Sequence, residues 1–349
     1  MALTFFLTFF HSCQSDSDSN TFHADLNVGP RSTGLYKQAG TDSDFIQELK
    51  PGTELLDLGE VSRFSSRVIY DGKNLSGPWI KVQTSEGTTG WVFLPDIRTQ
   101  NPNPIDWMHA KHLSSLLGKS GDAVFTSWEK SASTLQDETE LAKYYRESIS
   151  LQNTLNQQLR SRPTKDPEAD FSEYNWLEER LPCFALRYPQ EAAPEVKIDY
   201  THFAEKARKT SGEQDNQFFQ LCLEIYPLDS LESDFPVWLM PLSLNTSCSQ
   251  LGDGSYLRLL RKINQLKASA PIFNNELDHF QNLLLESLWN ETPQFWQAAN
   301  QAQSELDSLI QLGAPSLQTS ELESLKRLKS QMQAADSSGI RFNLRSGLY

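Results

Sequence analysis

The alternation of apolar and polar residues changes period once along the chain. From about Leu26 to Arg98, short runs of β-branched and aromatic residues are separated by Gly and Pro turns, which predicts strands. Beyond residue 104, apolar residues recur every three or four positions, the period of one helix face. The chain is therefore predicted to be multidomain, with a small all-β domain of five or so strands at 26–98 and a mainly α-helical domain at 105–349.

A hairpin is predicted near the end of the β region, in the stretch WIKVQTSEGTTGWVF at 79–93, which carries one Trp on each arm. Successive side chains of a strand point to opposite faces, so Ile80 and Val82 share one face and Trp79 takes the other. Gly87 suits the positive φ of the turn. We expect the two arms to pair, with Ile80 and Val82 inside the β domain.

Four apolar stripes predict helices that pack against one another in the second domain. They consist of Leu141, Tyr145, Ile149, Leu155 and Leu159; Leu257, Leu260, Ile263 and Leu266; Leu277, Phe280, Leu284 and Leu288; and Leu322, Leu325, Leu328 and Met332. Three short alternating stretches, at 184–188, 196–200 and 340–344, predict a small sheet against these helices. The segment TQNPNP at 99–104 predicts a linker between the domains.

The first thirteen residues, MALTFFLTFFHSC, join a short apolar run to a small residue and Cys13. This arrangement resembles a bacterial lipoprotein signal, in which the chain is cut before the Cys and the Cys carries the lipid. The polar tract at 14–25 is then a flexible tether. An ordinary apolar first helix is the alternative interpretation of the same residues.

The net charge argues against a nucleic-acid partner, and the length of the apolar runs argues against a transmembrane helix. The 349 residues include 45 Asp and Glu but only 31 Lys and Arg, for a net charge of −14. An acidic surface without a basic stripe repels phosphate backbones, so no nucleic-acid partner is expected. No apolar run approaches the roughly 18–20 residues that a transmembrane helix requires.

The search for catalytic and metal-binding residues yields one weak candidate. Cys248, in NTSCSQLGDGS, has small neighbours and precedes a helix, but the only downstream histidine, His279, lies in a helical stripe. A thiol peptidase also needs strands that carry the base, and no run of strands follows. His109 and His112 share a helical face without a third ligand, and no CxxC pair exists. We expect no metal and no cofactor.

The β region resembles the bacterial SH3 (SH3b) family. The resemblance rests on GLYKQAGTDSDFIQELKPGTELLDLGE and WIKVQTSEGTTGWVFLPDI, about a fifth of the chain. Its matching elements include the Phe45-Ile46 pair, the Pro51-Gly52-Thr53 turn and the closing Gly90-Trp91-Val92. It implies an SH3-like barrel that recognises cell-wall peptides or protein segments without catalysis. An insertion around 61–74 is expected to enlarge the loop before Trp79.

The candidate ligand-binding residues are aromatic, because aromatic rings offer rigid apolar area at little entropic cost. They are Tyr36, Tyr70, Trp79 and Trp91, and for both tryptophans a place in the core is the alternative. The expected protein is lipid-anchored through Cys13 in the cell envelope, outside the inner membrane, where it binds a cell-wall peptide or envelope protein. Two alternatives stay open: an envelope hydrolase with its site near Cys248, and a cytoplasmic adaptor.

Overall fold

The chain forms two compact units, which divide between Leu116 and Leu117. A computed structural model describes residues 24–70, 73–161, 174–188, 193–227, 235–243, 246–289, 293–313, 317–334 and 339–344. Cys13 and most of the predicted tether lie outside these residues. Helix α1 (Pro104–Ala132) crosses the division and is interrupted at Gly118, whose φ of 60° is one that glycine adopts without strain.

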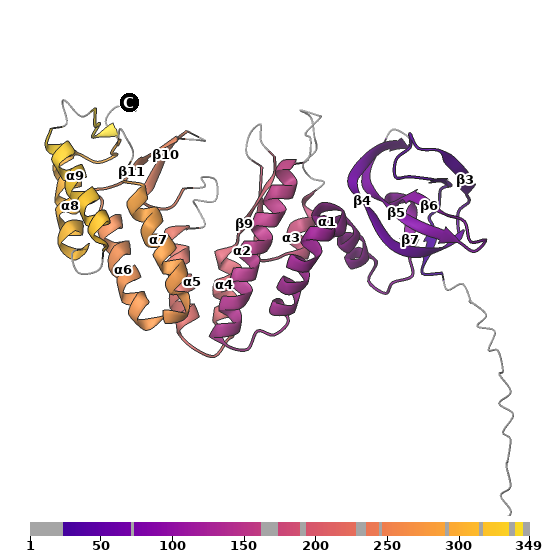
Figure 1. Cartoon of the computed structure of the whole chain (residues 1–349), viewed down its shortest axis with the longest axis horizontal. Helices are drawn as coiled ribbons and strands as arrows, with labels where there is room; N and C mark the ends of the chain where they lie inside the picture. The colour runs from indigo at the N-terminus through magenta and orange to yellow at the C-terminus, as the bar shows by residue number, and fades with distance from the viewer. Residues whose placement is uncertain are drawn as a thin grey trace, which may run out of the picture. The chain divides into compact units, whose positions relative to one another are not determined.

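The N-terminal unit contains one antiparallel sheet, which in the described residues has seven strands in the order β3-β2-β6-β5-β4-β1-β7. Figure 1 shows these strands curving around a common interior. The strands are β1 (Leu26–Val28), β2 (Thr33–Tyr36), β3 (Phe45–Leu49), β4 (Glu54–Tyr70), β5 (Lys73–Thr84), β6 (Thr89–Phe93) and β7 (Ile97–Thr99), with a 3-10 turn η1 (Leu94–Asp96) before β7. The prediction of an all-β region is confirmed, with more strands than expected.

The predicted hairpin is formed by β5 and β6. Trp79 lies opposite Phe93, and Lys81 lies opposite Trp91, so the two arms that carry the indoles are paired. Gly87 has a φ of 84°, as its predicted place in the turn requires. The sequence pattern therefore gave both the pairing and the turn correctly.

The interior of the N-terminal unit is filled by aliphatic side chains from most of its strands. They are Leu26, Val28, Leu35, Leu49, Leu55, Ile80, Val82, Val92, Leu94 and Ile97. Trp107, near the start of α1, packs against this core. Lys111 of α1 also forms an ion pair with Asp57 of β4, with 2.5 Å between Nζ and Oδ2. The first part of α1 thus belongs to the N-terminal unit.

The prediction of an enlarged loop at 61–74 is wrong, because β4 and β5 continue through most of this segment as paired strands. The ladder runs from Ser65 opposite Pro78 to Tyr70 opposite Lys73. The alternating run RVIY suits a strand, and its pairing with β5 turns the insertion into a longer hairpin. The register of this hairpin shifts twice between Asp57 and Ser65.

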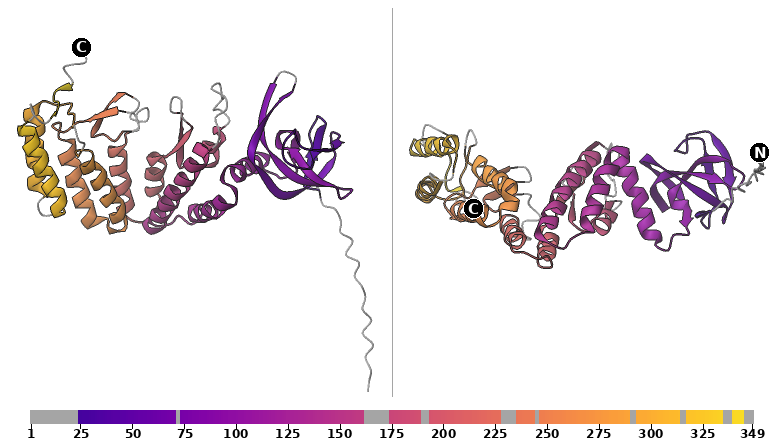
Figure 2. Two further views of the ribbon diagram at one scale, coloured as in Figure 1. Left: turned by 45° about the horizontal axis from the view of Figure 1, so that its top comes forward. Right: turned by 60° about the horizontal axis from the view of Figure 1, so that its bottom comes forward.

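The C-terminal unit is mainly helical, as predicted. Helices adjacent in sequence also contact one another, for instance α4 with α5 and α6 with α7, and the two views of Figure 2 agree with this arrangement. Leu141, Ile263 and Leu284, one from each of three predicted stripes, are completely buried. The helices after α1 are α2 (Glu138–Ser161), α3 (Trp176–Arg180), α4 (Tyr200–Ala207), α5 (Gln214–Ile225), α6 (Ser255–Ser269), α7 (Asn274–Glu286), α8 (Ala299–Gly313) and α9 (Thr319–Gln333).

A buried carboxylate from α8 caps the N-terminus of α6. Glu305 Oε2 accepts hydrogen bonds from the backbone N–H groups of Gly252 and Gly254, at 2.5 and 3.0 Å, and its Oε1 accepts one from Leu257 at 2.9 Å. The first N–H groups of a helix lack partners within the helix and favour negative charge. The chain therefore fills this anion-binding position with its own side chain.

The predicted three-stranded sheet is only partly correct. Stretches 184–188 and 196–200 contribute β8 (Phe184–Arg187) and β9 (Glu195–Ile198), which pair antiparallel in a two-stranded sheet. The stretch 340–344 does not join them, and Phe295 donates its backbone N–H to Arg341 O instead. Asn343 has a φ of 58°, which breaks the extended run that the alternation predicted. A further hairpin consists of β10 (Leu239–Ser243) and β11 (Thr246–Ser249).

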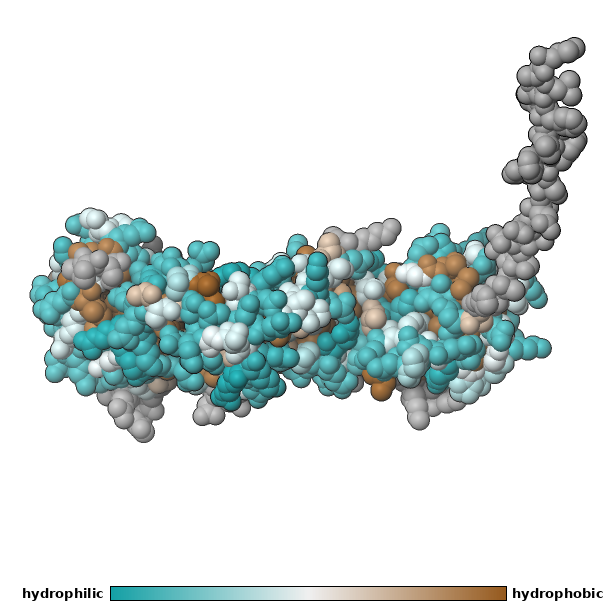
Figure 3. Space-filling model, turned by 90° about the horizontal axis from the view of Figure 1, so that it is seen from below, coloured by the Kyte–Doolittle hydropathy of each residue, from teal (hydrophilic) through white to brown (hydrophobic). Residues whose placement is uncertain are grey.

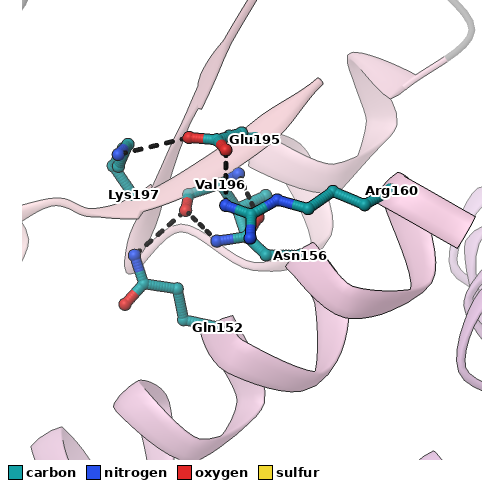
Figure 4. A network of polar contacts seen from close by, with 6 residues as sticks. All are labelled: Gln152, Asn156, Arg160, Glu195, Val196 and Lys197. Atoms are coloured by element: carbon teal, nitrogen blue, oxygen red, sulfur yellow. Dashed lines mark hydrogen bonds and ion pairs between the residues drawn. The ribbon is translucent and has the colours of Figure 1, made fainter. Parts of the chain in front are cut away.

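Helix α2 covers the outer edge of β9 with side-chain amides (Figure 4). Asn156 Nδ2 donates to Val196 O at 3.0 Å, and Asn156 Oδ1 accepts the Val196 N–H at 2.8 Å. Gln152 Nε2 donates to the same carbonyl at 3.0 Å. These amides use the backbone N–H and C=O of Val196 that a further strand would need for pairing, so this part of the β9 edge is closed to strand addition.

Candidate functional site

The candidate site lies on the outer side of the sheet in the N-terminal unit. Tyr36 of β2 is opposite Trp91 of β6, which is in turn opposite Lys81 of β5. Side chains directly opposite each other on neighbouring strands share one face. The alternate residues Ile80 and Val92 are buried in the interior. Tyr36 and Trp91 therefore lie together on the face that points away from the core.

Phe45, at the start of β3, extends this group of rings. It is opposite Tyr36, with 5.8 Å between the ring centroids and an edge-to-face angle of 76°. Its side chain is 58% exposed, and Tyr36 and Trp91 are half-buried. We call Tyr36, Phe45 and Trp91 the aromatic surface. Sequence reasoning listed Phe45 only as a family match, although an aromatic residue that opens a predicted strand is a usable signal.

The ring of Tyr36 is held in place by its neighbours. A Cβ at Gly34 would lie 2.5 Å from Tyr36 Cε2, so the ring lies over a position that only glycine leaves open. On another side, Trp79 meets Tyr36 edge to face at 5.4 Å between ring centroids. A ring fixed in this way loses little conformational entropy when a ligand covers it.

Trp79 does not belong to the ligand-binding residues as predicted, because its side chain is only 1% exposed. Its Nε1–H donates to Ser66 Oγ of β4 at 2.8 Å, and its ring packs against Phe93 at 5.5 Å between centroids. The unforeseen length of β4 supplies Ser66 and explains the burial. Trp79 therefore packs beside Tyr36 and supports the aromatic surface, but it offers no face to a ligand.

Tyr70, the fourth predicted residue, lies at the end of the β4–β5 hairpin, where its backbone pairs with Lys73. Its side chain lies outside the described part of the structure. Of the four predicted residues, the structure thus brings Tyr36 and Trp91 together on the surface and places Trp79, which is buried, against Tyr36.

Exposed ion pairs border the aromatic surface. Lys37 Nζ and Asp44 Oδ2 are 2.9 Å apart beside Tyr36 and Phe45, and Lys81 Nζ lies 2.7 Å from Glu60 Oε1. Figure 3 shows one face of the protein, which is mostly hydrophilic with small groups of hydrophobic residues along it. An apolar centre with a polar rim is the usual composition of a protein-binding surface.

Cys248 does not have the environment of a catalytic nucleophile. It lies in strand β11, away from any helix start, and is 2% exposed. Burial raises the pKa of its thiol, whereas an activated cysteine needs a lowered pKa. No histidine hydrogen-bonds to it among the described residues. The pKa of Cys183 is likewise raised, to about 11, mainly by burial, and that of Cys222 is raised for the same reason.

The histidine pair lies on one helix, as expected. His109 and His112 both belong to α1, and His109 is nearly buried. Within the part of the chain that the structure describes, no three His, Cys, Asp or Glu side chains are grouped so that they could hold a metal ion. In the same residues, no helix is both long enough and apolar enough to cross a bilayer.

The aromatic surface can bind a ligand by apolar contact, because Phe45 is exposed and Tyr36 and Trp91 are partly exposed. Strand β3 stands at one end of the strand order and pairs only with β2 in the described sheet, so its other edge carries backbone groups that the ladder does not use. No protein-family model, curated protein or solved structure matches this chain.

Proposed function

We propose that this chain is a non-catalytic binding protein of the cell envelope, and that its N-terminal unit binds an extended peptide or protein segment. The observation that carries the proposal is the aromatic surface of Tyr36, Phe45 and Trp91, which is contiguous and partly exposed. Aromatic residues dominate the binding energy of many interfaces because they bury much area at little entropic cost.

The SH3b-like character of the unit is part of the proposal. The residues that resemble the family include Phe45 and the closing Gly90-Trp91-Val92, and the aromatic surface uses two of them, Phe45 and Trp91. The family resemblance suggests a cell-wall peptide as the ligand. The end strand β3 adds backbone donors and acceptors beside Phe45, with which an extended segment can pair in the manner of strand addition.

The envelope location is proposed from the sequence around Cys13, which resembles a lipoprotein processing site. An envelope hydrolase receives less support, because Cys248 is buried and its thiol has a raised pKa. A cytoplasmic adaptor is compatible with the aromatic surface but leaves the apolar start and the polar tract after Cys13 without a role.

Substitution of Trp91 or Phe45 by Ala is expected to weaken retention of the protein on purified cell-wall sacculi. Each exposed ring removed from an interface core costs about 1–3 kcal/mol, which corresponds to about 5- to 150-fold in affinity. Co-sedimentation over a range of sacculus concentrations measures the effect. Ile105→Ala, which removes an exposed apolar side chain from α1, is the matched control and should bind like the wild type. Equal retention of all four proteins would contradict a role for the aromatic surface.

Lipidation is tested separately by metabolic labelling with a palmitate analogue in a bacterial host. The wild type should incorporate the label and partition with membranes, whereas Cys13→Ala should do neither, because the thioether that carries the lipid cannot form. Cys183→Ala controls for labelling at a buried thiol. A labelled Cys13→Ala protein, or an unlabelled wild type, would exclude the proposed anchor and leave the binding test unaffected.

A further inference from the structure

A small concavity lies between two consecutive helices of the C-terminal unit, away from the aromatic surface. Its volume is about 280 Å³. It is lined by Ala204 of α4, by Arg208 at the C-cap of that helix, and by Asn216, Gln217 and Gln220 of α5. The lining thus combines one guanidinium with three neutral amides and contains no carboxylate.

The guanidinium in this pocket lacks an acidic partner among the described residues, whereas four other arginines of the helical unit have one. Acidic residues outnumber basic ones by 45 to 31 in the chain. The arginine–glutamate pairs are Arg146 with Glu276, Arg160 with Glu195, Arg180 with Glu129 and Arg258 with Glu224. Arg208 is exposed at the pocket, and the side chain of Gln220 is also without a described partner.

The surroundings of Arg208 are electropositive as well. Lys206 lies in the last turn of α4 and Lys209 follows Arg208 just beyond the helix end, and their positive charges offset the negative end of the helix dipole. His202 lies in α4, before Arg208 in the chain. Burial is the main cause that lowers the pKa of His202, and the charge of Lys206 lowers this pKa further. Asp199 and Glu205 act in the opposite direction on that histidine but do not line the pocket.

We propose that this pocket binds a carboxylate, held by the planar fork of Arg208 and by N–H groups of the α5 amides. Arginine pairs with carboxylates through two parallel hydrogen bonds, and neutral amides can satisfy the remaining lone pairs. The volume lies below the lower end of ordinary ligand pockets, about 300 Å³, so it suits a small acid or one acidic side chain and is too small for a nucleotide cofactor. A single guanidinium among amides matches one negative charge better than the double charge of phosphate.

The test uses the full chain at low ionic strength, with calorimetry and NMR titration as readouts. The probes are glutarate, an acetylated and amidated Gly-Ser-Glu-Ser-Gly peptide, and inorganic phosphate. Millimolar binding of glutarate or of the peptide, tighter than that of phosphate, is expected. If glutarate and the peptide both bind, a carboxylate group is sufficient for binding. If only the peptide binds, the ligand is an acidic segment of a partner protein.

Arg208→Gln should weaken this binding about tenfold or more, because a charge-assisted pair is lost. Gln220→Ala should weaken it less, and Arg261→Gln, which removes an exposed arginine from α6, should leave it unchanged. Trp91→Ala should also have no effect, so this result stands apart from the test of the aromatic surface. The proposal is overturned if neither acid binds at millimolar concentration, if phosphate binds as tightly, or if Arg208→Gln binds like the wild type.

Discussion

Trp79→Ala is expected to lower the free energy of unfolding of the N-terminal unit by about 3–5 kcal/mol, the range for removal of a large aromatic side chain from a core. The indole is almost completely buried between Tyr36 and Phe93, and it donates a hydrogen bond to Ser66. Its removal leaves a cavity between Tyr36 and Phe93 and leaves the Ser66 hydroxyl on β4 without this hydrogen bond.

Hydrogen exchange monitored by mass spectrometry measures this effect, because it reports on peptides from 26–99 separately from the helical unit. Trp79→Phe is the informative control: it keeps most of the packing and loses the N–H donor, for an expected cost of about 1 kcal/mol or more. Unchanged protection in Trp79→Ala would contradict its place in the core. If protection falls as expected, a loss of ligand binding by Trp79→Ala reflects unfolding, whereas Trp91→Ala reports on contact with the ligand.

Glu305→Ala is expected to destabilise the C-terminal unit by about 3 kcal/mol, since hydrogen bonds to a charged group contribute about 1.5–3 kcal/mol each and partial solvation offsets some of the loss. Three backbone N–H groups at the start of α6 lose their acceptor in this variant. The N-terminus of α6 also loses the negative charge that stabilises its dipole.

Urea unfolding, followed by hydrogen exchange in peptides from α6 and α8, measures the effect of Glu305→Ala. Glu286→Ala is the matched control, because Glu286 is exposed on α7 and its side chain has no described partner. Salt should change the difference between wild type and Glu305→Ala only slightly, because the carboxylate is buried. A difference within about 0.5 kcal/mol, the usual effect of a surface substitution, would show that water replaces the carboxylate without loss.

Part of the candidate site follows from the sequence. The alternation around Ile80 and Val82 fixes which residues enter the core, and the same alternation places Trp91 on the opposite face. Phe45 was not singled out as a site residue, because its contact with Tyr36 depends on the pairing of β2 with β3. Local pattern gives the face of a residue, but only strand pairing gives its neighbours.

The sequence by itself determined the all-β region, the paired hairpin with Gly87 at its turn, and the helices that bear the buried stripes, because each depends on contacts close in the chain. Only the tertiary structure decided that Trp79 is buried and Trp91 partly exposed. Both side chains lie on the same face of the sheet, but neighbouring side chains cover Trp79 and leave part of Trp91 exposed. Ser66, thirteen residues away, reaches Trp79 through the extension of β4. The pocket at Arg208 likewise exists because α4 and α5 pack together, which no periodicity specifies.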